Sequence, residues 1–358
     1  MATASLPSTD RTASAPTAPD ATFPQSPAFW RALLREATTP RISAALGCLL
    51  TSVGGYLATM VVMYLTLQIS VLVTIALMPL ATAFLLRTFI VFHDCAHGSF
   101  FASRRANLWV GRLCATLVLV PFSSWRHEHN VHHATSGDLD KRGIGDVPTM
   151  TLAEYRDATP GARLGYRLFR NPLIMFGIGP IVAMIIGPRI VPMNGQRRFQ
   201  KSVLATDAVL TVIIGLLIWT LGVGRFFLLW APPALLAGSA GIWLFYVQHQ
   251  FEDVYWKRSE EWSYADAALR GSSFLDLPRP LAWATGNIGF HHIHHLSSRV
   301  PFYNLPRTHR ENAVFQSVPV LTFTEGLRCT RFKLYDEGRG RLITWPEAHE
   351  AFAATPQA

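Results

Sequence analysis

Histidine is the residue type in this chain whose spacing points most directly to chemistry. Nine of the 13 histidines form three clusters and one isolated site: His93 and His97; His129, His132 and His133; His249; and His291, His294 and His295. Side chains three or four residues apart lie on one face of a helix, with Cβ atoms about 5–6 Å apart. Neutral imidazole is a common metal ligand. The spacing therefore predicts metal-binding side chains on one helix face in each cluster.

The number of candidate ligands bears on the number of metal ions. One first-row ion accepts about four to six ligands, so nine imidazoles that converge would hold two ions. A structural zinc site closes with four ligands, often including cysteine. Soluble di-iron bundles use glutamates in Glu-x-x-His motifs, and the clusters contain no such motif. Because imidazole suits zinc, copper, iron and nickel alike, the histidines alone leave the metal open.

Other polar residues could support such a centre. Acidic side chains that could accept a ring N–H from a ligating histidine are Asp94, Asp138, Asp140, Asp146 and Glu252. Asn287, just before the third cluster, could cap its helix or orient a bound water. His127 and His292 fall on the wrong helix faces to be ligands, and we expect His309 and His349 at the surface.

The composition is too apolar for an ordinary soluble enzyme. Of 358 residues, 50% are hydrophobic and 15% are charged, whereas about 25% of residues in soluble domains are charged. The mean hydropathy is +0.23. The net charge of +9 suits an anionic membrane surface, and no nucleic-acid-binding motif occurs. The four cysteines lack paired spacing, which argues against a disulfide framework.

Four stretches have the length of a membrane-spanning helix, about 20 apolar residues. They cover roughly residues 43–64, 69–90, 203–222 and 226–247. Short turns join them in pairs, which predicts two hairpins. Arginine and lysine residues gather before the first and third spans and after the second, so the positive-inside rule places both termini and the middle segment in the cytoplasm. We therefore predict an all-α membrane protein with four transmembrane helices and a cytoplasmic helical cap that holds the histidines.

Two weaker apolar stretches lie at roughly 106–121 and 172–192. Arg112 interrupts the first, and glycines and prolines interrupt the second. If either crossed the membrane alone, the histidine clusters would lie on opposite sides. Because a shared metal centre needs them together, we interpret both stretches as interfacial or re-entrant.

The chain divides into three parts. Residues 1–30 are rich in Ala, Ser, Thr and Pro and lack the apolar region of a signal peptide, which predicts a disordered tail. Asp10 and Asp20 argue against a plastid transit peptide. Residues 31–325 form the membrane domain, and residues 326–358 form a cytoplasmic C-terminal segment.

Over roughly residues 40–325 the chain resembles the integral-membrane fatty acid desaturases, in the branch that includes the Δ12 (omega-6) acyl-lipid enzymes. The segments that carry the resemblance are FHDCAHGSFF from Phe92, WRHEHNVHHATSGDLDKRGIGD from Trp125, FYVQHQFEDVYW from Phe245 and TGNIGFHHIHHLSSRVPFYNL from Thr285. The resemblance implies that the eight clustered histidines are iron ligands and that His249 is the isolated additional ligand of the family.

The resemblance also implies a reaction and its cofactors. Two irons would use O₂ to remove two hydrogens from adjacent methylenes of an acyl chain and leave a cis double bond. Reduction of O₂ to water takes four electrons; because the substrate gives two, an external donor must give two more. The chain has no haem-binding His-Pro-Gly-Gly stretch, so the family suggests a separate ferredoxin-like donor, alternatively one like cytochrome b5. It could dock on basic surface such as Arg197, Arg198 and Lys201 in the cytoplasm of a bacterium, with the enzyme in the inner membrane.

One position departs from the acyl-CoA members, which carry an asparagine one helical turn before the isolated histidine. Here that position is Phe245, so either another group fills the role of the asparagine or one iron has fewer ligands. Aromatic residues that could line the acyl-chain tunnel are Trp243, Phe245, Tyr246, Trp256 and Trp283.

Two other functions fit part of the pattern. A membrane hydroxylase or ketolase acting on lipid, alkane or carotenoid would use the same histidine clusters, although the flanking sequence favours a desaturase. A metal transporter would need polar ligands deep within its spans, and these spans contain almost none.

Overall fold

The computed structural model describes residues 23–191 and 196–354. The first 22 residues of the predicted disordered tail lie outside this range. Residues 23–30 differ from that prediction: helix α1 (Pro27–Leu33) begins at Pro27, and Phe23 and Trp30 are buried. Trp30 stacks on Phe315, at a ring-centroid distance of 6.3 Å. The physical reason is that two large aromatic side chains follow the small polar residues and have a surface on which to pack.

Among the described residues, four helices are long and apolar enough to cross a membrane: Ile42–Leu67, Val71–His97, Arg197–Leu221 and Val223–His249. The first consists of α2 (Ile42–Leu49), the π-helical turn η1 (Leu50–Gly54) and α3 (Gly55–Leu67); the others are α4, α9 and α10. Many of their outward-facing side chains are apolar and exposed, such as Leu72 and Trp219. A helix that is apolar on all sides needs lipid as well as protein around it. These helices include the four predicted spans.

Helices α4 and α10 extend past the predicted spans at 69–90 and 226–247. Each has 27 residues, and each carries histidine in its last turns: His93 and His97 on α4, and His249 on α10. Helix α4 stops at Gly98, which has φ 71°, a left-handed conformation that suits glycine at a helix end.

The two weaker apolar stretches form bent helix pairs. Helices α5 (Arg104–Leu117) and α6 (Phe122–Thr135) meet at 102°, and α8 (Pro160–Phe169) meets the π-helical and 3₁₀ segment η2–η4 (Ile174–Arg189) at 64°. If each bent pair is counted as one span, the described chain has up to six. The α5–α6 pair, however, begins just after His97 and ends just after His133, and these two imidazole rings lie 4.7 Å apart. The chain between His97 and His133 therefore returns to the region from which it leaves.

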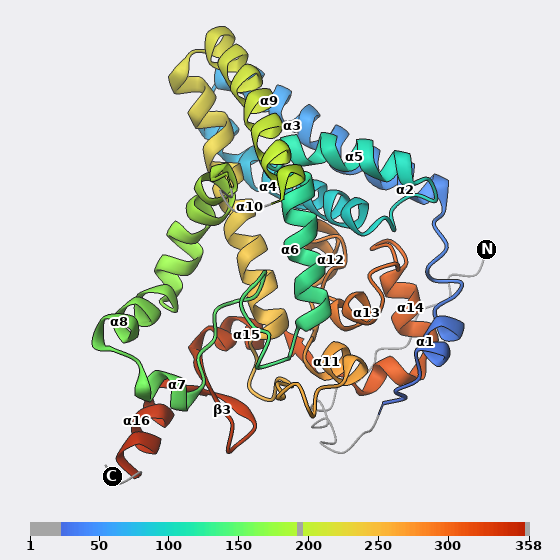
Figure 1. Cartoon of the computed structure of the whole chain (residues 1–358). Coiled ribbons are helices and arrows are strands. Elements are labelled where there is room, and N and C mark those ends of the chain that lie inside the picture. The colour runs from blue at the N-terminus through green and yellow to red at the C-terminus, as the bar shows by residue number, and fades with distance from the viewer. Residues whose placement is uncertain (1–22, 192–195, 355–358) are drawn as a thin grey trace, which may run out of the picture.

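The remaining elements surround the histidine-bearing helices. They are α7 (Leu152–Asp157), α11 (Tyr264–Arg270), β1 (Phe274–Asp276), α12 (Arg279–Ala284), α13 (His291–Leu296), α14 (Leu305–Glu311), η5 (Ala313–Ser317), β2 (Val320–Thr322), α15 (Phe323–Arg328), η6 (Cys329–Arg331), β3 (Phe332–Asp336), β4 (Arg341–Thr344) and α16 (Trp345–Ala354). Strands β1 and β2 are parallel, and β3 and β4 are antiparallel. Figure 1 shows α3, α4 and α9 at one end of the molecule, α7, β3 and α16 at the other, and α6 and α13 between them.

The C-terminal segment is joined closely to the rest of the chain. Leu334 and Ile343 of β3 and β4 form a small core with Tyr155 and Tyr166 of α7 and α8. The backbone N–H of Tyr335 donates to Met150 O at 3.0 Å. Strands β3 and β4 therefore continue the fold of the histidine-bearing part.

Candidate metal centre

The last turns of α4 and α10, together with α6 and α13, direct all nine predicted histidines toward one region. His93 and His97 lie one helical turn apart on α4, with ring centroids 4.8 Å apart. The two short helices supply three residues each: His129, His132 and His133 from α6, and His291, His294 and His295 from α13. The nine separate into two groups, within each of which the candidate ligand atoms all lie within 4.8 Å of one another.

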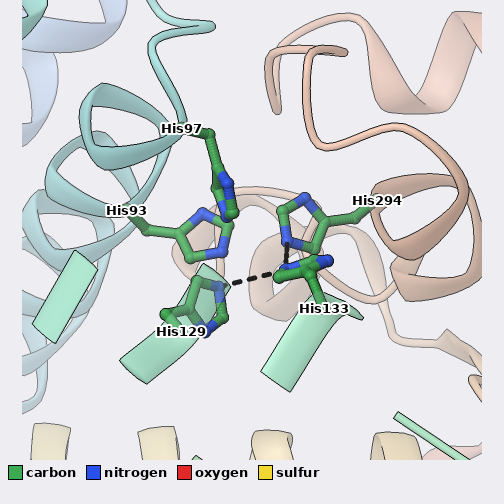
Figure 2. A group of neighbouring side chains, drawn as sticks. All are labelled: His93, His97, His129, His133 and His294. Carbon is green, nitrogen blue, oxygen red and sulfur yellow. Dashed lines mark hydrogen bonds between the residues drawn. The ribbon is translucent and has the colours of Figure 1, made fainter. Parts of the chain in front are cut away.

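The first group contains His93, His97, His129, His133 and His294. Figure 2 shows the five rings pointing toward one another from α4, α6 and α13. Nε2 of His133 lies 3.2 Å from Nε2 of His129 and 2.9 Å from Nε2 of His294. An imidazole nitrogen carries either one hydrogen or one lone pair, so His133 Nε2 cannot form a good hydrogen bond to both neighbours.

The second group contains His132, His249, His291 and His295. Nε2 of His249 lies 2.9 Å from Nε2 of His291. The rings of His133 and His295, one from each group, stack with centroids 4.2 Å apart. The two groups therefore adjoin.

The spacing of these nitrogens suits a bound metal. With metal–nitrogen bonds of about 2.0–2.1 Å, neighbouring ligands on one ion are about 2.9–3.4 Å apart. Five nitrogens of the nine rings are buried with no hydrogen-bond partner in the described chain: His97 Nε2, His132 Nε2, His133 Nδ1, His291 Nδ1 and His295 Nε2. Buried polar atoms are normally paired. The donor set thus fits two first-row metal ions, one in each group.

Three rings are oriented by an acceptor for their other nitrogen. Nδ1 of His132 lies 2.6 Å from Asp146 Oδ1, and Nδ1 of His93 lies 3.1 Å from Asp94 Oδ1. Nδ1 of His249 lies 3.1 Å from the carbonyl oxygen of Gly271. Such contacts hold the proton on Nδ1 and leave Nε2 free to bind metal.

Burial keeps the imidazoles of α13 neutral. It lowers the pKa of His291, His294 and His295 well below the ordinary value, and neighbouring histidines lower it further. Neutral imidazole is the form that binds metal, so these side chains are ready to act as ligands at neutral pH.

An apolar cavity of about 530 Å³ adjoins the histidines. His93, His129 and His291 form part of its wall, and most of the remaining wall is apolar. Other residues that line it include Leu85, Val203, Trp230, Ala234, Ala183 and Met184, from α4, α9, α10 and η3. A largely apolar cavity therefore adjoins both groups.

The sequence profile of the family described as "Fatty acid desaturase" matches residues 69–321. The chain belongs to the fatty acid desaturase family. A protein of Bacillus subtilis named "Fatty acid desaturase" is 43% identical over 266 residues, 74% of this chain and 76% of that protein.

Two cyanobacterial proteins that are also similar to the present chain have more specific names. The "sn-1 oleoyl-lipid 12-desaturase" of Synechocystis is 30% identical over 229 residues, 63% of this chain and 64% of that protein. The "sn-1 acyl-lipid omega-3 desaturase (ferredoxin)" of the same organism is 28% identical over 235 residues, 61% of each chain.

The acidic side chains predicted to support the desaturase ligands divide into two sets. Asp94 and Asp146 contact histidine rings as described. Asp138 instead pairs with Lys141, Asp140 with Arg258, and Glu252 with Arg341. Sequence position could not separate the two sets because all five lie within 13 residues of a candidate histidine ligand.

The prediction for His309 was wrong. It is 8% exposed, because Phe274 and Phe290 cover its ring at centroid distances of 4.8 and 5.1 Å. Its Nδ1 lies 3.3 Å from His292 Nε2, and burial lowers its pKa to about 4. His349 is exposed, as predicted.

The other excluded residues lie apart from the two groups. His127 stacks on Phe199 with centroids 4.7 Å apart, and neither His127 nor His292 belongs to a group. The N-cap of α13 is Phe290, which makes no side-chain cap. Asn287 therefore does not cap that helix; it lies three residues earlier in a left-handed turn with φ 57°.

Of the five aromatic residues predicted to line the tunnel, Phe245 alone lines the described cavity. Tyr246 points to the opposite side of α10 and bonds to Arg170, and Trp283 covers Arg87. Trp243 lies against Phe323 and Trp256 near Tyr335. The prediction missed Trp125, which lines the cavity and stacks on His129 at 4.4 Å. Its position four residues before His129, on the same helix face, is a signal that could have found it.

We expect Asp146→Asn to weaken metal binding in the second group. The amide cannot accept the Nδ1 proton of His132 as strongly as the carboxylate does, and loss of such a partner typically lowers metal affinity about 10- to 100-fold. Metal content of the purified protein, measured against increasing chelator, tests this. Asp140→Asn, which alters an exposed ion pair, serves as the control; equal metal retention in both variants would contradict the assigned role.

Proposed function

We propose that this protein is an O₂-dependent di-iron desaturase that introduces a cis double bond into the acyl chain of a membrane lipid, at a Δ12 (omega-6)-like position. The proposal rests on one observation: nine imidazoles form two groups, and both groups adjoin one apolar cavity. The names of the cyanobacterial relatives support a lipid-linked acyl chain and the Δ12 position.

The nine histidines would hold the two irons. His93, His97, His129, His133 and His294 would bind one, and His132, His249, His291 and His295 the other. When bound, the irons would supply the oxidising power to break an unactivated C–H bond, which no amino-acid side chain can provide.

The protein's own part is to place the substrate and exclude water. The cavity wall is built mainly from aliphatic and aromatic side chains, so an acyl chain enters it at a gain of roughly 0.8 kcal/mol per buried CH₂. The rings of His93, His129 and His291 in that wall bring the bound chain to the metal groups. A fixed depth of insertion would select which pair of methylenes reacts.

The position of Phe245 supports a difference in ligand number between the two irons. Its ring centroid lies 5.0 Å from that of His132 and 5.4 Å from that of His249. At the position where the acyl-CoA members carry an asparagine, this chain has the apolar ring of Phe245. We infer that the second iron has four histidine ligands and that no side chain holds a water from this position.

Each turnover needs two electrons from an external donor, because the substrate supplies two of the four that reduce O₂ to two waters. A ferredoxin-like donor is supported by the name of one relative. Arg197, Arg198 and Lys201 are exposed at the start of α9 and could attract an acidic donor. Salt would then weaken the interaction by screening, and a salt-insensitive donor affinity would contradict this docking surface.

For the membrane topology, we propose two hairpins, α2–α4 and α9–α10, with both termini and the histidines on the cytoplasmic side of a bacterial inner membrane. A 27-residue helix is about 40 Å long, some 10 Å more than the hydrocarbon core. The histidines at the ends of α4 and α10 would therefore lie beyond the core. The α5–α6 pair would be re-entrant, since the chain between His97 and His133 returns to the region from which it leaves.

Expression in a host that lacks the product tests the reaction. Gas chromatography–mass spectrometry of the lipids should detect new double bonds, and their mapped position tests the regiochemistry. His133→Ala and His294→Ala should each abolish the product because each removes a ligand of the first group, whereas His349→Ala, at the surface, should retain it. New hydroxy acids without new double bonds would contradict desaturation, and activity in either ligand variant would remove that histidine from the ligand set.

Cysteine labelling in intact bacterial cells tests the topology. Gln68→Cys and Val223→Cys lie in the two turns, and a membrane-impermeant thiol reagent added outside should label both. Lys141→Cys, near the histidines, should react only after lysis; external labelling at position 141 would place the site on the other side.

A further inference from the structure

Arg170, which follows α8, is one of the largest fully buried side chains in the described chain and is 1% exposed. Its guanidinium donates to five oxygens: Pro148 O, Thr149 Oγ1, Tyr246 OH, Gln250 Oε1 and Phe332 O, at 2.8–3.4 Å. Each of these acceptors is neutral. A buried charge held by neutral oxygens is costly to remove from water, so the arrangement must be maintained by the segments around it.

The five acceptors belong to three segments distant in sequence. Tyr246 and Gln250 flank His249 at the end of α10. Pro148 and Thr149 follow Asp146, the carboxylate that holds His132. Phe332 begins β3 of the C-terminal segment.

Further hydrogen bonds join the C-terminal segment to Arg170 and to α10. Lys333 Nζ donates to the carbonyl oxygen of Arg170 at 2.7 Å, and the Tyr246 hydroxyl donates to Phe332 O at 2.9 Å. Arg170 and β3 therefore fix each other, and both are fixed to the end of α10.

Partners of Arg170 lie close in sequence to His249 and to the carboxylate that holds His132. His249 and His132 are two of the four members of the second group. We propose that Arg170 is a positioning residue for the second metal: by joining α10, the loop after Asp146 and β3, it sets the places of His249 and His132. This inference rests on the proposed function, because it assumes that the second group binds metal.

Arginine suits this role because its planar fork presents five N–H donors in fixed directions. A shorter side chain would leave several buried oxygens without a donor. The last turn of α10 and the loop would then move to find water or other partners, and the ligand nitrogens would lose the separations that one ion requires.

The test counts metal ions per chain in detergent-purified protein by native mass spectrometry, which distinguishes chains with one ion from a mixture of empty and full chains. The unaltered protein should carry about two ions. Arg170→Gln should carry about one, because the first group does not depend on these contacts. Tyr246→Phe, which removes only a hydroxyl, should lower the affinity of the second site in the same direction under chelator challenge.

Arg167→Gln is the matched control. Arg167 lies on α8, bonds Tyr155 and stacks on Trp345 of α16 at 4.9 Å, so it joins the same helix to the C-terminal segment without touching α10. It should keep about two ions. Equal loss in both arginine variants, or two ions in Arg170→Gln, would overturn the inference. If Arg170→Gln does not accumulate, Tyr246→Phe decides, and unchanged affinity there would overturn it. Absence of metal from the unaltered protein would instead contradict the proposed function.

Discussion

The structure depends on one constraint: nine imidazoles must be held together, largely away from water, with their nitrogens facing one another. Each buried nitrogen without a partner costs about 1–3 kcal/mol, and five of the rings have such an atom. This cost is recovered only if something binds them. The surrounding helices, the carboxylates of Asp94 and Asp146 and the carbonyl of Gly271 hold the rings in place. They hold the nine rings as a preorganised set of candidate metal ligands.

The long helices solve a second problem, which is to connect a polar site to an apolar setting. Ligands within the hydrocarbon core would be costly. Helices α4 and α10 instead continue past their most apolar stretches, so that His93, His97 and His249 lie on rigid extensions of the same helices. The shorter α6 and α13 complete both groups from the side. The apolar cavity lies among these elements, so its position relative to the ligands is set by helix packing.

Local patterns in the sequence predicted much of this arrangement. Apolar stretches located the four long helices, and helical spacing located the eight clustered histidines, because both patterns repeat within a few residues. Features that depend on distant segments were not predictable in this way. Asp140 is closer than Asp146 to a histidine cluster in sequence, yet only Asp146 reaches a ring. His309 was predicted to lie at the surface, yet Phe274 and Phe290 cover its ring. The C-terminal segment seemed separate because Phe332 of β3 bonds to Arg170 and Tyr246, both more than 80 positions away.

Part of the cavity wall comes from segments that carry none of the nine grouped histidines. The nine grouped histidines lie on α4, α6, α10 and α13, whereas Ala183, Met184 and Val203 in the cavity wall lie on η3 and α9. Mutations at these three wall residues can therefore change the shape of the cavity without altering a helix that carries a grouped histidine. In the proposed desaturase, such a division would allow the shape of the acyl-chain cavity to change while the metal-binding helices stay the same.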